Sequence, residues 1–181
     1  MPSSELLRRA IAGVMRGGQE GRLPLFAWTL GLPQEELLRM LAHCFAELPP
    51  LEPMTPLQYA AVQESTPAHF HDLVGLLLAH STHKVVEPRV RWLAHALAAA
   101  CFGGQHLWEE LELDSRASVS LLLQIYFAPL YQANTAQLRW KRFLFGQLAQ
   151  AVGADALRPP KFHQCNDFDL CYPAATNAKA P

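Results

Sequence analysis

Hydrophobic residues recur at helical spacing along most of this chain. In the stretch 34–46, Leu37, Leu38, Leu41 and Phe45 fall on one stripe, the i, i+3, i+4 spacing typical of an amphipathic helix. Valine and isoleucine are scarce, whereas alanine, leucine and glutamine, which favour helices, are abundant. The pattern therefore predicts an all-α protein that folds as an irregular helical bundle.

Turn residues and apolar periodicity together divide the chain into predicted helices. These cover residues 3–15, 25–30, 34–46, 57–62, 69–80, 89–102, 106–111, 115–131 and 135–152. Gly17-Gly18 is expected to stop the first helix, Pro129 to bend the eighth, and Asn134 to cap the last. The helix over 89–102 is apolar almost all the way round and holds five alanines, so we predict that it is central and buried.

A proline-rich stretch at 49–56 is the best candidate for a boundary inside the chain. It separates a predicted N-terminal helical subdomain, 1–48, from a main helical body, 57–152. A cysteine-bearing loop is predicted over 153–173, and a low-complexity, disordered tail over 174–181.

Charge and length restrict the class of protein. The 181 residues carry a net charge of −1 and contain no run of lysine or arginine, which argues against nucleic acid or an anionic membrane as the main partner. The N-terminus has no continuous apolar region of a signal peptide, and no apolar run is long enough to span a bilayer. We therefore expect a cytoplasmic protein with reduced thiols.

The chain has no serine elbow, phosphate-binding glycine loop or zinc-protease motif, so we do not expect an enzyme.

The candidate chemistry lies near the C-terminus, where Cys165 and Cys171 share a short segment with His163. Thiolates and imidazole in such a segment can hold a transition metal or an iron–sulfur unit, although a closed site needs four ligands. Two chains could supply four thiolates, which makes a homodimer one way to complete the site. The alternative is a pair of ordinary loop thiols, with Asp167 and Asp169 solvated rather than ligating. Cys44 and Cys101, on apolar helix faces, are interpreted as small buried hydrophobes.

Three blocks of sequence, 72–80, 105–111 and 134–145, occur in an order that resembles the NifQ family of nitrogen-fixation proteins. The resemblance covers about residues 23–171 and includes His-Leu-Trp at 106–108 and Arg-Trp-Lys-Arg-Phe at 139–143. It implies a molybdenum donor that binds an iron–molybdenum–sulfur species. The implied partners are molybdate and the proteins that assemble the iron–molybdenum cofactor of nitrogenase.

The family's tail carries four cysteines in the spacing Cys-x4-Cys-x2-Cys-x5-Cys. Cys165 and Cys171 fit the last two positions, whereas the first two fall on Leu157 and Phe162, which cannot ligate a metal. The resemblance thus implies that the chain keeps the helical body of the family, and that two of the family's four cysteine ligands are replaced by residues that cannot ligate. His163, beside the second lost position, is a candidate auxiliary ligand.

Two further residues are candidates for contact with the bound species. Lys141 falls inside the apolar arc of the last predicted helix. Its cation is expected to snorkel out to solvent or to form an internal ion pair with one of the glutamates, and contact with an oxyanion such as molybdate is the alternative. His106 either hydrogen-bonds neighbouring backbone at a helix start or, as the resemblance implies, adds a ligand. His80 and His83 have a spacing that could hold a metal, but a satisfied core histidine is the better interpretation of His80.

The sequence thus favours a molybdenum carrier with Cys165 and Cys171 as primary ligands and His163 as an auxiliary one. Two alternatives stay open at this point. One is a metal-free helical interaction module whose tail binds nothing. The other is a mononuclear zinc or iron site built from His163, the two cysteines and an aspartate.

Overall fold

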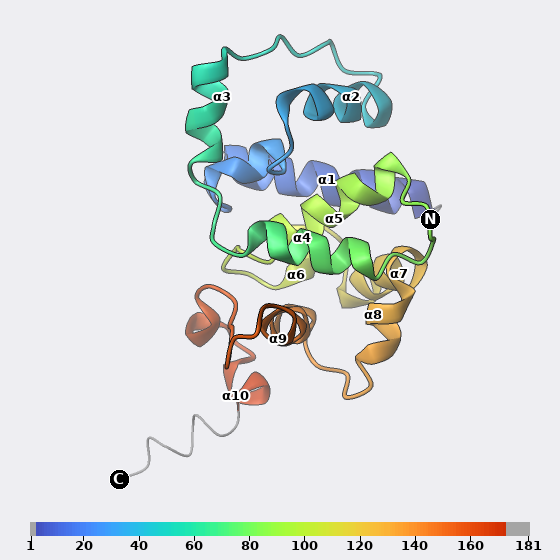
Figure 1. The fold of residues 1–181 in the computed structure, drawn as a ribbon, viewed down its shortest axis with the longest axis vertical. Helices are drawn as coiled ribbons and strands as arrows, with labels where there is room; N and C mark the ends of the chain where they lie inside the picture. The colour runs from blue at the N-terminus through green and yellow to red at the C-terminus, as the bar shows by residue number, and fades with distance from the viewer. Residues whose placement is uncertain (1–2, 173–181) are drawn as a thin grey trace.

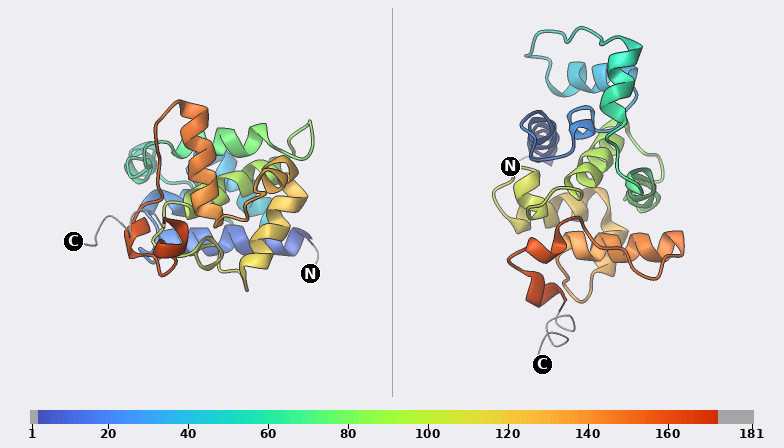
Figure 2. Two further views of the ribbon diagram at one scale, coloured as in Figure 1. Left: turned by 90° about the horizontal axis from the view of Figure 1, so that it is seen from below. Right: turned by 90° about the vertical axis from the view of Figure 1, so that its left-hand side faces the viewer.

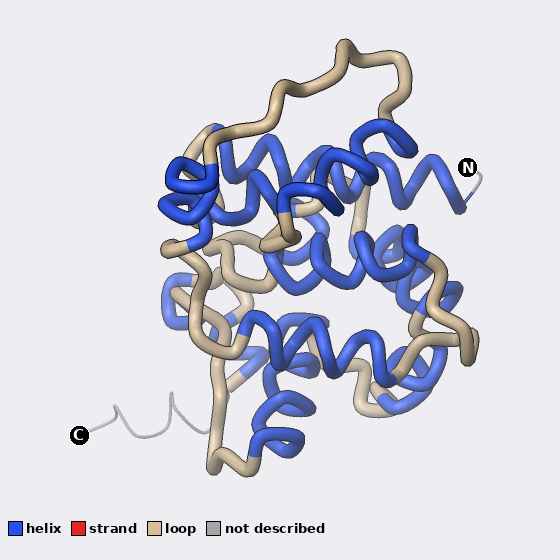
Figure 3. The backbone as a smooth tube through the Cα atoms, turned by 45° about the horizontal axis from the view of Figure 1, so that its top comes forward, coloured by secondary structure: helices blue, strands red, loops and turns tan. Residues whose placement is uncertain are grey.

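The structure, a computed structural model, describes residues 3–172, and this part of the chain consists of helices and loops only (Figures 1 and 3). The elements are α1 (Ser3–Gln19), η1 (Leu25–Thr29), α2 (Gln34–Cys44), α3 (Pro56–Gln63), α4 (Phe70–Ala79), α5 (Pro88–Ala100), α6 (Leu107–Glu110), α7 (Arg116–Tyr126), α8 (Ala128–Ala133), α9 (Trp140–Val152), η2 (Phe162–Gln164) and α10 (Phe168–Cys171). The all-helical prediction is confirmed for these residues. The predicted tail, 174–181, lies outside them.

Helix α5 lies at the centre of the bundle, as its apolar composition predicted. Ten of its 13 residues are buried, and it packs against α1 and α4 (Figure 1). Its one buried histidine, His95, donates a hydrogen bond from Nδ1 to the carbonyl oxygen of Leu30 at 2.8 Å. Helix α4 in turn packs against α9, so the core connects the central helix to the C-terminal part of the molecule.

Helix α1 continues through Gly17-Gly18 to Gln19, so the prediction that these glycines stop it was wrong. They serve close packing instead. A Cβ atom on Gly18 would lie 2.4 Å from the backbone nitrogen of Trp28, and one on Gly13 would lie 2.6 Å from the carbonyl oxygen of Leu111. Glycine therefore lets α1 approach the backbone of two other segments.

Two other helix bounds differ from those expected. The helix predicted from residue 115 divides at Phe127, two residues before Pro129, into α7 and α8. The last helix begins at Trp140 rather than Thr135, because the Asn134 side chain closes a loop instead of capping a helix. Its Oδ1 accepts a hydrogen bond from the backbone nitrogen of Leu138, and its Nδ2 donates to the Leu138 carbonyl, both at 2.9 Å.

The proline-rich stretch 49–55 is an exposed connection without helix between α2 and α3. One hydrophobic core includes Leu7 of α1, Leu93 of α5 and Leu148 of α9, and so contains residues from both sides of this connection. The predicted division into subdomains stays a prediction. Within residues 3–172, no helix combines the length and apolarity needed to cross a bilayer.

Candidate functional site

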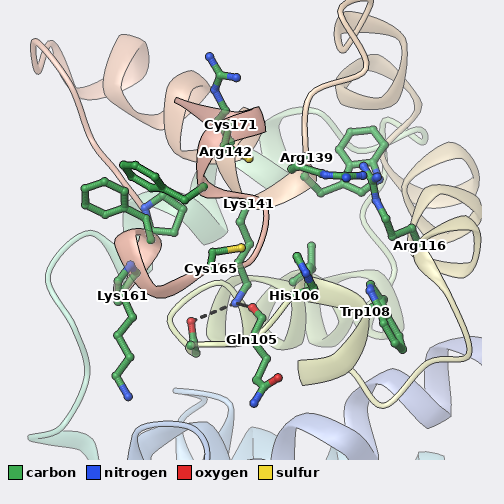
Figure 4. Close-up of a pocket in the computed structure, with 18 of the residues that line it drawn as sticks. Gln105, His106, Trp108, Arg116, Arg139, Lys141, Arg142, Lys161, Cys165 and Cys171 are labelled. Carbon is green, nitrogen blue, oxygen red and sulfur yellow. Dashed lines mark hydrogen bonds between the residues drawn. The ribbon is translucent and has the colours of Figure 1, made fainter. Parts of the chain in front are cut away.

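A pocket of about 70 Å³ lies where the C-terminal segment folds back on the helical body (Figure 4). Its walls are the loop and helix start at 103–108, the first turns of α7 and α9, and residues from the segment 159–172. Four of the five predicted site residues line it: His106, Lys141, Cys165 and Cys171. The fifth, His163, is exposed and does not line the pocket, although it neighbours Phe162, which does.

Lys141 is held by the loop opposite α9. Its Nζ donates hydrogen bonds to the carbonyl oxygens of Gly103, at 3.0 Å, and Gln105, and lies 3.9 Å from Oε1 of Glu110. Burial lowers the pKa of the ammonium group, and the acidic groups of Cys101, Glu110 and Cys165 oppose that effect. The expected internal ion pair with a glutamate is therefore present, with Glu110 as the partner, whereas the two hydrogen bonds to backbone carbonyls were not expected. Contact with an oxyanion stays a prediction.

The loop that receives Lys141 is shaped by two consecutive glutamates. Oε1 of the fully buried Glu110 accepts from the backbone nitrogen of Gln105 at 2.7 Å, and Oε2 of Glu109 accepts from that of His106 at 2.9 Å. A Cβ atom on Gly103 would lie 2.1 Å from Oε1 of Glu110, so only glycine fits there. Sequence reasoning missed Glu110, although a glutamate among the apolar residues of 107–111 was a usable signal.

The two C-terminal cysteines face the same pocket in different environments. Cys165 is half-buried and lies beside Lys141 (Figure 4). Its Sγ accepts a hydrogen bond from the backbone nitrogen of Asp167 at 3.4 Å. Cys171 is buried, and burial, followed by the charge of Cys165, raises the pKa of its thiol. Cys165 thus lies close enough to raise the pKa of the Cys171 thiol, as expected for two groups at one site.

The other two cysteines behave as small apolar residues, as predicted. Cys101 is completely buried in the core, and burial raises the pKa of its thiol to about 12. Cys44 is also buried, and its pKa is raised for the same reason. Neither lines the pocket.

Asp167 holds the C-terminal segment against the body. Its Oδ2 accepts from Nε of Arg139, the N-cap residue of α9, at 2.7 Å, and lies 3.9 Å from Nε2 of His106. The interpretation of Asp167 as a solvated carboxylate was wrong, because a basic side chain far away in sequence reaches it. This ion pair ties the start of α9 to the C-terminal segment.

An aromatic cluster fills the centre of the C-terminal segment. The rings of Phe162, Phe168 and Tyr172 lie 5.3–5.9 Å apart between centroids. The guanidinium of Arg158 lies over Phe162 at 4.9 Å and over Tyr172 at 5.1 Å, and that of Arg142 lies over Tyr172 at 5.3 Å. Phe162 falls on one of the two positions that the family resemblance assigns to a missing cysteine, and the structure places it in this aromatic cluster.

The lining of the pocket is rich in basic side chains, two of which, Arg139 and Lys141, have a carboxylate within 4 Å. Five of its lining residues are lysine or arginine, and none is aspartate or glutamate: Arg116, Arg139, Lys141, Arg142 and Lys161. Two of them, Arg116 and Lys161, were not singled out from the sequence, because only the fold brings them to the other three. Such a lining favours an anionic ligand.

In the described part of the chain, the other histidines do not join the two thiols in a set of metal ligands. The ring nitrogen Nδ1 of His80 lies 2.8 Å from the carbonyl oxygen of Leu76, as expected of a satisfied histidine, but the residue is half-buried rather than in the core. Across residues 3–172, no three histidine, cysteine, aspartate or glutamate side chains form a ready metal site.

Comparisons with a family model and with curated proteins all point to one family. The family model described as NifQ matches residues 7–173. The chain is 39% identical to the protein NifQ of Azotobacter vinelandii over 49% of this chain and 45% of that protein. It is 31% identical to a NifQ homolog of Sinorhizobium fredii over 78% of this chain and 60% of that protein, and 32% identical to NifQ of Rhodobacter capsulatus over 49% of each. The matches thus span about half the length of these curated relatives, and no solved structure matches.

Proposed function

The chain belongs to the NifQ family, and we propose that it is a carrier that supplies molybdenum to assembly of the nitrogenase iron–molybdenum cofactor. The observation that supports this proposal best is the composition of one pocket. Two thiols and five cationic side chains line it, and no carboxylate does. Anionic molybdenum species, whether the molybdate oxyanion or an iron–molybdenum–sulfur cluster with thiolate ligands, suit that combination.

The residues of the pocket have complementary tasks in this proposal. The guanidinium and ammonium groups attract the anionic cargo and balance its charge in a partly buried setting. The thiolates of Cys165 and Cys171 supply soft ligands to the metal. Because Cys165 is the more exposed of the two, it meets incoming cargo first, and buried Cys171 then completes the attachment. His163 can join only if the segment around η2 turns, since its side chain lies outside the pocket.

A set of two thiolates leaves the cargo open to exchange. Closed structural sites and ordinary iron–sulfur clusters use four protein ligands, so the remaining positions are left for sulfide, solvent, a second chain or the receiving protein. A homodimer that shares one cluster is one form of this arrangement. An open position is what handing over a metal requires, and it suits a carrier in the reducing cytoplasm better than a turnover enzyme.

Growth on dinitrogen tests the proposal in the cell. A carrier raises the local supply of molybdenum but performs no step that abundant free molybdate could not replace by mass action. A nitrogen-fixing bacterium without its own NifQ should therefore need this chain when molybdate is scarce and not when it is abundant. A requirement for the chain that is equal at both molybdate levels would contradict the proposal.

One structural feature favours the rival interpretation of a metal-free interaction module. The aromatic cluster around Phe162 gives the C-terminal segment a packed centre without any metal. The rival predicts a colourless protein without metal after anaerobic purification, whereas a carrier contains molybdenum. A mononuclear site would show zinc or iron without sulfide, so metal and sulfide analysis separates all three.

A further inference from the structure

The C-terminal segment, residues 159–172, holds its shape through contacts inside itself. Each backbone hydrogen bond that the structure describes for these residues joins two residues of the segment. Phe162, Phe168 and Tyr172 pack against one another at its centre. None of its residues belongs to the hydrophobic core that includes residues of α1, α5 and α9. The segment is therefore a small unit attached to the helical body rather than a part of the bundle.

Weak side-chain contacts hold this unit against the body. Within residues 3–172, no backbone hydrogen bond joins the two. Asp167 accepts from Arg139 at 2.7 Å, and the guanidinium of Arg142 lies over the ring of Tyr172 at 5.3 Å. Partly exposed ion pairs and cation–π contacts are individually weak. The segment also lies at the end of the molecule farthest from α2 and α3 (Figures 1 and 2), so it could move without disturbing them.

The connection from α9 to the segment, residues 155–158, suits a hinge. It takes part in none of the hydrogen bonds described within residues 3–172, and only Leu157 among its four residues is partly buried. Leu157 packs against the core and so stays with the body. Arg158 goes with the segment, because its guanidinium lies over the rings of Phe162 and Tyr172. Rotation between these two residues would move the segment as a whole.

The two sides of the pocket carry different chemistry. Both thiols, those of Cys165 and Cys171, stand on the segment, whereas four of the five basic side chains stand on the body. The wall on the body is fixed from within, since Lys141 donates to the carbonyls of Gly103 and Gln105. Separation of the two sides would therefore leave a bound metal with the thiols and remove it from four cations that balance its charge.

The closed pocket is small for a cluster. Its volume of about 70 Å³ holds roughly five water molecules. An iron–molybdenum–sulfur cluster contains several metal and sulfide atoms and needs more room. Such a cargo enters or leaves only if one wall moves, and the C-terminal segment is the wall with the weakest attachment.

From these features we infer that the C-terminal segment swings out about residues 155–158 as one unit and carries both thiols away from the body. The motion admits the cargo and later presents it to a receiving protein, a role that rests on the proposed function. Opening breaks the ion pair of Arg139 with Asp167 and the contact of Arg142 with Tyr172. The aromatic cluster and the core of the body stay intact.

The reactivity of Cys171 toward a water-soluble disulfide reagent tests the motion in the full chain without cargo. Cys171 and Cys44 are 8% and 6% exposed, so each reacts only after the structure around it opens. In the Cys165→Ser chain we expect Cys171 to react at least about tenfold faster than Cys44, because it needs only the segment to open. Mass spectrometry of digests assigns each label. Equal rates for the two thiols would overturn the proposal.

Two changes at the junction separate opening from a direct effect of charge on the thiol. Besides burial and the neighbouring thiol, Arg142 lowers the pKa of Cys171 and Asp167 raises it. The direct effects of Arg142→Gln and Asp167→Asn on the amount of thiolate are therefore opposite. Opening predicts that both changes speed the reaction of Cys171, by about two- to fivefold. Rate changes of opposite sign would overturn the proposal. The matched control, Asp114→Asn, breaks an ion pair with Arg9 inside the body and should leave the rate as it is.

Release of molybdenum tests the role of the motion separately. The anaerobically purified chain is mixed with a small dithiol chelator, and the transfer of molybdenum is followed over time. Asp167→Asn should release its molybdenum faster than the unaltered chain, and Asp114→Asn should match the unaltered chain. Equal release by all three would overturn the role of the segment in hand-over. A chain without molybdenum would contradict the carrier instead, while the thiol rates still decide whether the segment opens.

Discussion

Arg139 and Asp167 form an ion pair across the junction between the helical body and the C-terminal segment, with Nε of the arginine 2.7 Å from Oδ2 of the carboxylate. The two side chains are 31% and 20% exposed, so the pair is partly protected from water. It joins the N-cap residue of α9 to the N-cap residue of α10, and it positions both cysteines of the segment near the pocket.

Removal of this ion pair should loosen the segment without unfolding the body. Asp167→Asn is expected to speed tryptic cleavage after Lys161, while the free energy of unfolding falls by less than about 1 kcal/mol. Asp169→Asn is the control, because that carboxylate is exposed and two residues away. Mass spectrometry of timed digests measures the cleavage. If Asp167→Asn and Asp169→Asn are cut at the same rate, the pair does not hold the segment.

The four thiols should differ in reactivity toward a water-soluble disulfide reagent. One thiol, that of Cys165, is expected to react promptly in the native chain, because it is the only one of the four that is not buried. Cys101 should react only on unfolding, since its pKa of about 12 leaves almost no thiolate at neutral pH. Cys165→Ser should remove the prompt phase and Cys44→Ser should not. A prompt phase that survives Cys165→Ser would contradict this assignment.

Acid should weaken the bundle through His95. Burial lowers the pKa of this imidazole below its usual 6.5, so the unfolded chain binds a proton at a higher pH than the folded one. The stabilisation is fully present above pH 6.5 and is lost as the pH falls toward the lowered folded pKa, by no more than about 1.4 kcal/mol per pH unit.

Urea unfolding at pH 7.5 and at pH 5.5 measures this loss. His95→Gln, which keeps a donor for the Leu30 carbonyl, should reduce the difference between the two pH values. The same change at His83, an exposed histidine, should leave the difference as it is. An unaltered difference in His95→Gln would show that another group carries the pH dependence.

Two glycine-to-alanine changes should have opposite effects on stability. At Gly103 the new Cβ would lie 2.1 Å from Glu110 Oε1, so we expect a loss of about 1–3 kcal/mol and a displaced loop around Lys141. At Gly146, inside α9, a new Cβ would meet nothing within 4 Å beyond the neighbouring residues and backbone of its own helix, so alanine should stabilise the helix by up to about 1 kcal/mol. Denaturant unfolding compares them. A neutral Gly103→Ala would mean that the loop adapts freely.

Local pattern located most of the helices, but it did not give the end of α1, the division of α7 from α8 or the contacts between helices. Apolar periodicity predicted the buried α5 and placed Lys141 inside the apolar arc of the last helix. It could not show that the glycines of α1 serve close packing, because the Trp28 backbone that approaches Gly18 comes from a separate turn. Single sequence positions also gave no sign that Arg139 would meet Asp167, since that pairing depends on how the C-terminal segment folds back.

The residues of the pocket, too, could be predicted only in part from the sequence. The cysteine spacing and the family resemblance identified Cys165 and Cys171, and the fold then added Arg116 and Lys161 from two other segments. Five basic side chains line the pocket although the chain as a whole has a net charge of −1, so composition alone gave no indication of this lining.

The central claim is that Cys165 and Cys171 hold molybdenum. Its most direct test is the molybdenum, iron and sulfide content of anaerobically purified chains, compared among the unaltered protein, Cys165→Ser/Cys171→Ser and the control Cys44→Ser. We predict that the unaltered protein and the control contain molybdenum, and that the double variant loses most of it while its helical circular dichroism spectrum is unchanged. Full retention of molybdenum by the double variant, or its absence from the unaltered protein, would contradict the account.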